Sequence, residues 1–300
     1  MNEDAKYYEQ VKYEALNDGC MRALSTAPTV DYPSDFKVDL VMWVKNGERT
    51  LDRVLKRINQ VIPKRFIGQK IIVNDHSTDG TAYIIFANHW RQVNNCGFGI
   101  SDAANLALSL VRTKYFCSFE QDVLLAKDWW PKISKLIVNR KGVVAASGVR
   151  FLNQNHFCFN IEPYLSCSGV EDYGKTLDNT LWNTSLLRGL GGFPVMDNAF
   201  CETILHHEIS DKGLLWCVDK DTCSLHLHSS FLEELKHQYF YGLNMRELQA
   251  KADFKVNGLN KVMKSPFSAL KMVLKMHDPR LFIAYPLCRL AWLGGYLHKA

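Results

Sequence analysis

Short apolar runs that alternate with helical stretches constrain the fold of this chain more than any other feature of its sequence. The runs occupy residues 38–44, 69–75, 114–120 and 142–149. Their apolar residues follow one another without strict alternation, which is typical of strands buried on both faces of a sheet. The stretches between them have the spacing of amphipathic helices, at residues 47–61, 79–90 and 101–112. The sequence therefore predicts an α/β fold with a mostly parallel central sheet flanked by helices.

The length of the chain fits one large domain with appendages. Its 300 residues, 47% of them hydrophobic, can bury a sizeable core. Residues 26–37 contain two prolines and several turn formers, so we interpret them as a linker that follows a helical stretch at 5–24. We therefore divide the chain into an N-terminal helical extension and linker (1–36), an α/β domain (37–230) and a C-terminal helical tail (231–300).

Positive charge is concentrated near the C-terminal end of the sequence. The formal net charge is +5, and residues 255–300 contain eight lysines and arginines against the single acid Asp278. The rest of the chain is close to neutral. Because the basic residues do not spread over the whole chain, we do not expect nucleic acid as a partner.

The cysteines and the N-terminus favour a reducing compartment. Nine cysteines are an odd number, no Cys-x-x-Cys pair occurs, and several lie inside apolar runs, where cysteine acts as a small hydrophobe. The first residues are polar and acidic, unlike a signal peptide. We therefore expect a cytoplasmic protein.

Carboxylates lie at the ends of two predicted strands. Asp75 ends the run at 69–75, and Glu120 and Asp122 end the run at 114–120 and follow it. In parallel α/β sheets, ligands bind beyond the carboxyl ends of the strands. Two acidic strand ends in one sheet therefore predict a shared, ligand-binding crevice rather than two solvated turns.

Five segments, in this order along the chain, resemble the signatures of family 2 glycosyltransferases with the GT-A fold. They read VDLVMWVKNGERTLDRVL, IIVNDHSTDGT, NNCGFG, KYFCSFEQDVLLAKDWW and GLGGF, and the likeness extends over about residues 37–230. The resemblance implies a GT-A (nucleotide-diphospho-sugar transferase) fold. It also implies an enzyme that moves a sugar from a nucleotide-sugar donor, first of all a UDP-sugar, to a glycan or lipid-linked acceptor.

The resemblance assigns four residues to the nucleotide. Asp75 matches the acid that hydrogen-bonds the base, and a carboxylate suits a base edge that presents an N–H donor. Asn46 matches a position that lines the nucleotide pocket, but a plain strand-to-helix turn residue explains it equally well. Asn105 matches the asparagine after the glycine-rich segment, and Glu120 matches a ribose or metal contact. We expect residues 77–79 to cap the following helix.

The same resemblance implies a divalent metal site. Residues 120–122 fall where the family keeps its Asp-x-Asp motif, so Asp122 becomes a metal ligand, whereas Glu120 departs from the usual aspartate. Oxygen ligands suit Mg²⁺ or Mn²⁺, which would offset the charge of a leaving diphosphate. His226 matches the terminal histidine of the family and is a possible third ligand, with His228 as its neighbouring candidate.

The catalytic base that the resemblance implies is Glu202. It aligns with the second acid of the pair that follows the Gly-Gly-Phe turn, while Cys201 replaces the first acid. An ordinary favourable contact with a helix dipole is the open alternative for Glu202. The implied reaction is a single inverting displacement. The chain lacks the Gln-x-x-Arg-Trp motif of processive relatives, so we expect one sugar per encounter. His206 and His207 are interpreted as cleft or surface residues.

The tail predicts attachment to an anionic membrane surface without a membrane-spanning helix. Met263, Phe267, Leu270 and Leu274 recur at helical spacing, and Lys264, Lys271 and Lys275 lie off that stripe. A basic amphipathic helix of this kind lies in the headgroup plane. The apolar stretch 281–297 is short and contains Pro286 and Arg289, while its Tyr285, Trp292 and Tyr296 suit an interface. The alternative is that both segments pack on the α/β domain.

Two other functions remain open. A degenerate GT-A domain would bind a nucleotide sugar or a partner without turnover, and the departures at Glu120 and Cys201 favour it mildly. A nucleotidyltransferase needs a glycine-rich basic loop after its first strand, but residues 43–50 contain one glycine. The segment GFGISD (97–102) resembles a dinucleotide-binding loop superficially, but we predict no strand before it.

Overall fold

The computed structural model describes residues 30–168, 173–196, 199–227, 230–252 and 258–298. Its strands are β1 (Val38–Val44), β2 (Ile67–Asn74), β3 (Arg91–Asn94), β4 (Tyr115–Glu120), β5 (Val123–Leu124), β6 (Val143–Leu152), β7 (Thr180–Asn183) and β8 (Leu215–His226). Its α-helices are α2 (Leu51–Val61), α3 (Thr81–Ala87), α4 (Gly99–Leu110), α5 (Trp129–Ile137), α6 (Ile161–Cys167), α7 (Thr184–Gly189), α8 (Cys201–Asp211), α9 (Phe231–Ala252), α10 (Gly258–Met276) and α11 (Leu281–Leu297). The predicted helix at 5–24 lies outside the described residues.

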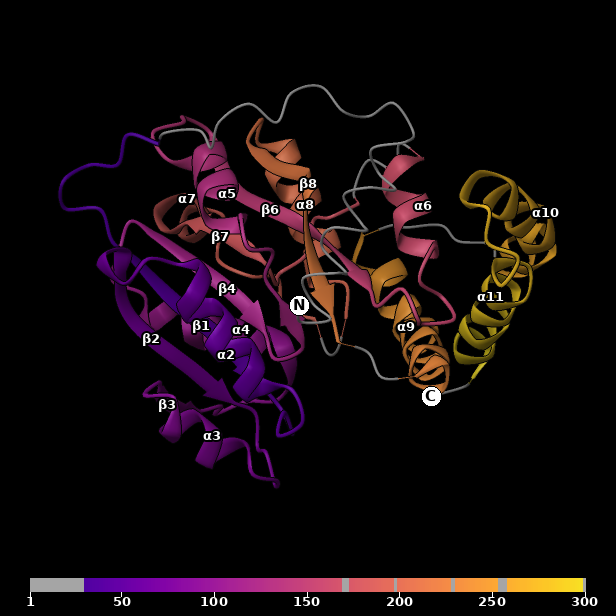
Figure 1. Ribbon diagram of the computed structural model, residues 1–300, viewed down its shortest axis with the longest axis horizontal. Helices are drawn as coiled ribbons and strands as arrows, with labels where there is room; N and C mark the ends of the chain where they lie inside the picture. Colours follow the sequence, from indigo (N-terminus) through magenta and orange to yellow (C-terminus); the bar gives the residue numbers. More distant parts are fainter. Residues whose placement is uncertain (1–29, 169–172, 197–198, 228–229, 253–257, 299–300) are drawn as a thin grey trace.

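These strands form an eight-stranded sheet in the order β3-β2-β1-β4-β7-β6-β8-β5 (Figure 1). β7 runs antiparallel to both of its neighbours, β4 and β6, and β5 runs antiparallel to β8. The other pairs are parallel. The predicted α/β fold with a mostly parallel central sheet is therefore confirmed, with β7 as an antiparallel insertion in its middle.

Burial on both faces explains why the strands read as continuous apolar runs. Every residue of β1 is buried. Leu40 and Met42 pack into one hydrophobic cluster with α2 and α5, whereas Val41 and Trp43 pack into another with α4 and α8. Since alternate side chains of a strand point to opposite faces, each face of the sheet has its own core.

The strand β3 corrects one prediction from the sequence. Residues 91–94 pair in parallel with the end of β2, so a strand does precede the segment at 97–102. β3 lies at the edge of the sheet, and its side chains are largely exposed. An edge strand with polar residues lacks the apolar pattern on which the prediction depended.

The C-terminal helices pack on the α/β domain and on each other. A Cβ placed on Gly242 of α9 would lie 2.0 Å from the carbonyl oxygen of Trp292 in α11, so only glycine allows this close helix crossing. Trp292 is 3% exposed and belongs to the same hydrophobic cluster as Val41 and Trp182. It is therefore a core residue, and the prediction that Trp292 lies at an interface was wrong. The domain boundary at residue 230 stays a prediction.

Among the described helices, none combines the length and the apolar character that a bilayer span requires.

Candidate active site

The predicted site residues gather at the edge of the sheet where the parallel strands end. Asp75 follows β2 directly, and Glu120 is the last residue of β4. Glu120 pairs in register with Trp43 of β1, so the acid pair lies beside the loop that follows β1. His226 ends β8 at the same edge, where β8 runs parallel to β6. The expectation of one shared crevice agrees with this topology.

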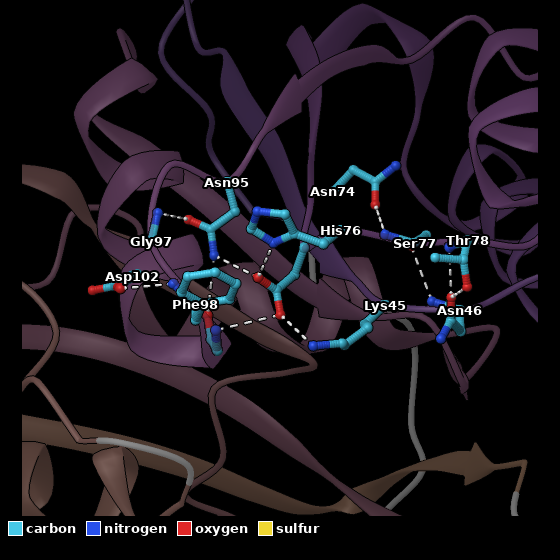
Figure 2. Close-up of polar contacts among 12 residues, drawn as sticks. Lys45, Asn46, Asn74, His76, Ser77, Thr78, Asn95, Gly97, Phe98 and Asp102 are labelled. Atoms are coloured by element: carbon cyan, nitrogen blue, oxygen red, sulfur yellow. Dashed lines mark hydrogen bonds and ion pairs between the residues drawn. The ribbon is translucent and has the colours of Figure 1, made fainter.

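Asp75 is buried and accepts hydrogen bonds on both carboxylate oxygens. One oxygen accepts from Asn95 Nδ2 at 2.8 Å and lies 3.3 Å from His76 Nδ1 (Figure 2). The other accepts from Lys45 Nζ and from the backbone N–H of Gly99, both at 3.3 Å. Burial alone would raise the pKa of Asp75, but these hydrogen bonds outweigh it and lower the pKa below its usual value. Asp75 is therefore an anion at neutral pH.

An aromatic pair lies next to Asp75. The ring of Phe98 stacks on His76, with centroids 4.7 Å apart and planes 15° apart, and Phe98 is 73% exposed (Figure 2). A planar base can stack on such an exposed ring. Lys45, Asn95 and Phe98 were not singled out from the sequence, because they follow no periodic pattern and gain their place only from the fold.

Asn46 ties together the loops after β1 and β2. Its Oδ1 accepts from the backbone N–H of Thr78 at 2.9 Å, and its backbone N–H donates to Ser77 Oγ at 3.0 Å (Figure 2). Its φ of 50° is left-handed, which asparagine tolerates. The turn role that the sequence left open is present, and direct contact with a nucleotide stays a prediction. Asp79 accepts from the backbone N–H of Thr81, the first residue of α3, at 3.0 Å.

Asn105 holds the Gly-Gly-Phe turn. Its Oδ1 accepts from the backbone N–H of Phe193 at 2.9 Å, and its Nδ2 donates to the carbonyl of the same residue at 2.8 Å. Gly192 has a φ of 91°, and a Cβ there would lie 2.7 Å from Asn105 Oδ1. The structure thus links α4 to the turn that leads toward α8, and the predicted contact of Asn105 with a nucleotide stays a prediction.

Two predicted metal ligands lie side by side. Asp122 Oδ2 is 3.6 Å from His226 Nε2, because β5 pairs with the end of β8 and places Val123 opposite His226. A carboxylate and an imidazole can both ligate a divalent ion. Within the described residues, no cluster of three or more His, Cys, Asp or Glu side chains is arranged to hold an ion. His228 lies outside the described residues.

Gln121, between the two acids, is a structural residue. Its Oε1 accepts from the backbone N–H of Lys45 at 2.9 Å, and its Nε2 donates to the carbonyl of Lys45 at 3.0 Å. This pair of bonds fixes the turn after β4 against the loop after β1. The acids on either side are therefore held at the crevice by a defined backbone.

Arg150, which the sequence analysis did not identify, joins the acids of the site. Its Nη1 lies 2.8 Å from Asp178 Oδ1 and 3.2 Å from Glu120 Oε2. Asp178 is 1% exposed, so this ion pair is buried. Burial raises the pKa of Glu120 to about 8, and the charge of Asp178 adds to this, while Arg150 opposes it.

Glu202, in the first turn of α8, faces the same group of charges. Burial raises the pKa of Glu202, while a backbone hydrogen bond and the charge of Arg150 lower it. The charge of Glu202 also raises the pKa of Glu120. Burial is the main cause of the raised pKa of Tyr241 in α9. The charge of Arg150 lowers this pKa, and the charge of Glu202 raises it. The two predicted halves of the site, Glu120 and Glu202, therefore lie within electrostatic reach of each other.

The two histidines of α8 contact each other and nearby polar groups. His206 Nε2 contacts Lys175 Nζ and lies 3.2 Å from Ser210 Oγ. Its ring packs beside that of His207, at a centroid distance of 5.6 Å. His207 is exposed and His206 is half-buried, and a place for them in an acceptor cleft stays a prediction.

Removing the cation from this cluster should destabilise the fold. We expect Arg150→Gln to lower the free energy of unfolding by roughly 3 kcal/mol at pH 7, because it leaves Asp178 buried without its cation. Urea unfolding at pH 7 measures the loss.

Arg150→Gln/Asp178→Asn is the matched control, because it removes both charges of the buried pair. It should recover part of the lost stability. An unchanged unfolding midpoint in Arg150→Gln at pH 7 would show that the cluster carries no such energy.

The chain matches a family model and is similar in fold to solved structures. The model of the family described as Glycosyl transferase family 2 matches residues 39–212. The structure is similar to the mannosyltransferase PcManGT from Pyrobaculum calidifontis in complex with GDP-Man and Mn²⁺, with a TM-score of 0.58 and 18% sequence identity over 96% of this chain and 81% of that chain.

A second similar structure is glucosyl-3-phosphoglycerate synthase from Mycobacterium tuberculosis in complex with Mn²⁺, UDP and glucosyl-3-phosphoglycerate. The TM-score is 0.55 and the identity 16%, over 74% of this chain and 82% of that chain. No curated protein sequence matches the chain significantly. These likenesses confirm the predicted GT-A fold.

Proposed function

Because this chain belongs to glycosyl transferase family 2, we propose that it transfers a sugar from a nucleotide-sugar donor in a single, inverting, metal-dependent step. One observation carries the proposal. Glu120 and Asp122 end β4 at the crevice, and Glu202 of α8 lies within electrostatic reach of Glu120. An inverting displacement needs one set of groups toward the leaving diphosphate and another toward the attacking hydroxyl. Glu120 and Asp122 would form the first set, and Glu202 the second.

The donor base would bind at Asp75 and Phe98. An anionic carboxylate accepts from a base edge that carries an N–H, as the uracil imide does. Phe98 offers an exposed ring for stacking beside it. The side chain of Lys45 is 57% exposed while it pairs with Asp75, so it can turn toward a bound diphosphate without breaking the fold. A UDP-sugar remains the first expectation, and GDP-sugars share the required N–H.

Asp122 and His226 would hold Mg²⁺ or Mn²⁺ at the diphosphate. Their 3.6 Å approach and their oxygen and nitrogen donors fit such an ion, and both similar structures named above contain Mn²⁺. When bound, the ion offsets the negative charge that develops on the departing diphosphate. Glu120, which pairs with Arg150, would then contact the ribose or lie next to the metal ligands.

Glu202 would accept the proton of the acceptor hydroxyl. Its raised pKa makes it a stronger base than an ordinary surface glutamate. Asn105 would have a structural role, because its side chain fixes the turn at Phe193 that precedes α8. Cys201, which replaces an acid of the family, does not share this role, since burial raises its pKa to about 12.

A screen of UDP-, GDP- and dTDP-sugars by thermal stabilisation tests donor binding. One nucleotide class should raise the melting temperature in the presence of Mn²⁺ or Mg²⁺ and have little effect with EDTA. At a ligand concentration of about 100 times Kd, the expected stabilisation is about 2.7 kcal/mol. If no nucleotide sugar shifts the melting temperature with either metal, the proposed function fails.

The degenerate GT-A alternative would also bind a donor in that screen. It differs in turnover alone, and the replacement of an acid by the buried Cys201 is the observation that favours it. Because Glu202 remains as a base beside Glu120, we favour the enzyme.

We propose a lipid-linked or other membrane-proximal acceptor and a single sugar addition. The sequence lacks the Gln-x-x-Arg-Trp motif of processive relatives, and residues 150–180 would shape the acceptor side. With a suitable acceptor, mass spectrometry should show a product one sugar heavier as the dominant species. A ladder of long polymers at low enzyme concentration would contradict single addition.

A further inference from the structure

The helix α10 exposes an apolar stripe on the side opposite its buried face. Met263, Phe267 and Leu274 are 67%, 72% and 67% exposed, and Leu259 and Leu270 complete the stripe. Its buried residues are Gly258, Ser265, Ala269 and Met272. With about 100° of rotation per residue, the two groups fall on nearly opposite sides of the helix. The stripe therefore faces away from the domain.

The helix α11 has the same arrangement. Its buried residues, Leu281, Ala284, Cys288, Trp292 and Gly295, recur at helical spacing toward the domain. Its exposed large residues are all apolar, namely Phe282, Ile283, Leu287, Leu290 and Leu297. They lie on the side of α11 opposite its buried residues.

The two stripes belong to neighbouring helices at one end of the molecule. α10 and α11 lie together at the end away from β2 and β3 (Figure 1). A Cβ on Gly258 of α10 would be 3.1 Å from the Trp292 ring of α11, and Lys261 Nζ lies 5.3 Å from the centroid of that ring. We call the ten exposed apolar residues of α10 and α11 the outer apolar face. Each stripe exposes five large apolar side chains, and exposed apolar residues gathered in this way mark an interaction site.

Lysines border the outer apolar face along α10. Lys264, Lys271 and Lys275 fall between the exposed stripe and the buried side of the helix. Lys275 is fixed there, because its Nζ donates to the carbonyl of Cys167 at 3.3 Å. In residues 258–298 the single acid is Asp278, which is buried and paired with Arg280 at 2.9 Å. No carboxylate of this segment therefore offsets the lysines at the border.

From this arrangement we propose that the outer apolar face docks on an anionic membrane surface, with α10 and α11 in the headgroup plane. Apolar side chains would enter the acyl boundary while the bordering lysines meet anionic headgroups. A second copy of this chain fits less well. A two-fold contact is self-complementary, so it would place the lysines of one copy near those of the other. Docking extends the proposed function by placing the active site near a lipid-linked acceptor, but it does not require turnover.

Vesicle co-sedimentation of the full chain tests the docking. Wild type should bind vesicles that contain about one-third phosphatidylserine at low salt, and bind pure phosphatidylcholine vesicles much more weakly. Phe267→Glu/Leu274→Glu should abolish binding, because it puts charges in the apolar stripe. Lys264→Gln/Lys271→Gln should lower the partition coefficient by about 30-fold, at roughly a factor of five for each lysine.

The matched control is Tyr83→Glu/Phe86→Glu, which changes two equally exposed apolar residues of α3 and should bind like wild type. Circular dichroism of each variant checks the fold, and its donor-dependent thermal shift checks the nucleotide site. A variant that passes both checks but does not bind vesicles shows a loss of docking alone. Failure of docking is therefore distinct from failure of the proposed function. Absent binding by wild type, equal binding of neutral vesicles, or undiminished binding of Phe267→Glu/Leu274→Glu would overturn the proposal. The proposal would also be overturned if wild type bound no vesicles but formed a dimer in solution, and if Phe267→Glu/Leu274→Glu abolished that dimer.

Discussion

Glu202→Gln is expected to lower kcat by a factor of about 10²–10⁴, with the dissociation constant of the donor nearly unchanged. The substitution keeps the size of the side chain and its place in the first turn of α8, but removes the proton acceptor. It also removes a negative charge beside Glu120 and Asp178. Stability should therefore be kept or slightly raised, which separates a catalytic loss from unfolding.

The pH profile of wild type supplies a second readout for Glu202. A general base must be deprotonated, and the pKa of Glu202 is raised above its ordinary 4.5 by burial. The rate should therefore fall on the acid side at a pH above 4.5, and Glu202→Gln should lose this limb. Glu208→Gln is the matched control, because it makes the same change on the same helix.

Activity of Glu202→Gln within a few-fold of wild type would contradict the assignment of the base. In that case His206 and His207 are the next residues to replace. Asp197 follows the Gly-Gly-Phe turn in the sequence and is a further residue to replace, and it lies outside the described residues.

Asp122→Ala is expected to abolish metal-dependent donor binding while the fold stays intact. Its Oδ2 lies 3.6 Å from His226 Nε2, and we propose that both side chains ligate the ion. One contact of Asp122 with the fold uses its backbone, because its carbonyl accepts from the N–H of Leu227 at 2.8 Å. The alanine variant keeps this hydrogen bond. Calorimetric titration of the donor with Mn²⁺ and with EDTA measures the loss.

Asp128→Ala is a suitable control for the metal prediction. Asp128 lies directly before α5, and its carboxylate pairs with Lys132 at 2.7 Å. It should keep full metal dependence. Undiminished dependence on Mn²⁺ in Asp122→Ala would remove Asp122 from the metal site.

The strands that the sequence predicted well are those buried on both faces. Residues 38–44 and 142–149 correspond to β1 and to most of β6, because their apolar residues serve two cores at once. β3 and β7 lack this signal. β3 is an exposed edge strand, and β7 is four residues long within a segment that has no periodic pattern. Local sequence cannot indicate that β7 inserts antiparallel between β4 and β6.

The candidate site also contains some residues that the sequence predicted and others that it did not. Asp75, Glu120 and Asp122 were predictable, because carboxylates at the ends of apolar runs are unusual and fall at one edge of a parallel sheet. Arg150 was not, since its partners Glu120 and Asp178 lie far from it along the chain and meet it only across β4, β7 and β6. Long-range ion pairs of this kind leave no local pattern.

Trp292 shows a limit of residue type as a guide to location. Tryptophan near basic residues suits a membrane interface, yet Trp292 lies in the core next to α9. The exposed apolar residues of α10, by contrast, are those that helical spacing indicated. Periodicity identified the exposed stripe, whereas residue type alone did not.

Release of nucleoside diphosphate from the donor that stabilises the protein tests the central claim most directly. The assay uses the full chain, Mn²⁺ and that nucleotide sugar, with and without candidate acceptors. We predict release by wild type that requires Mn²⁺, rises with a true acceptor, and is lost in both Asp122→Ala and Glu202→Gln. Tight, metal-dependent donor binding by wild type with no release over days, whichever acceptor is present, would contradict the enzyme and favour a domain that binds without turnover.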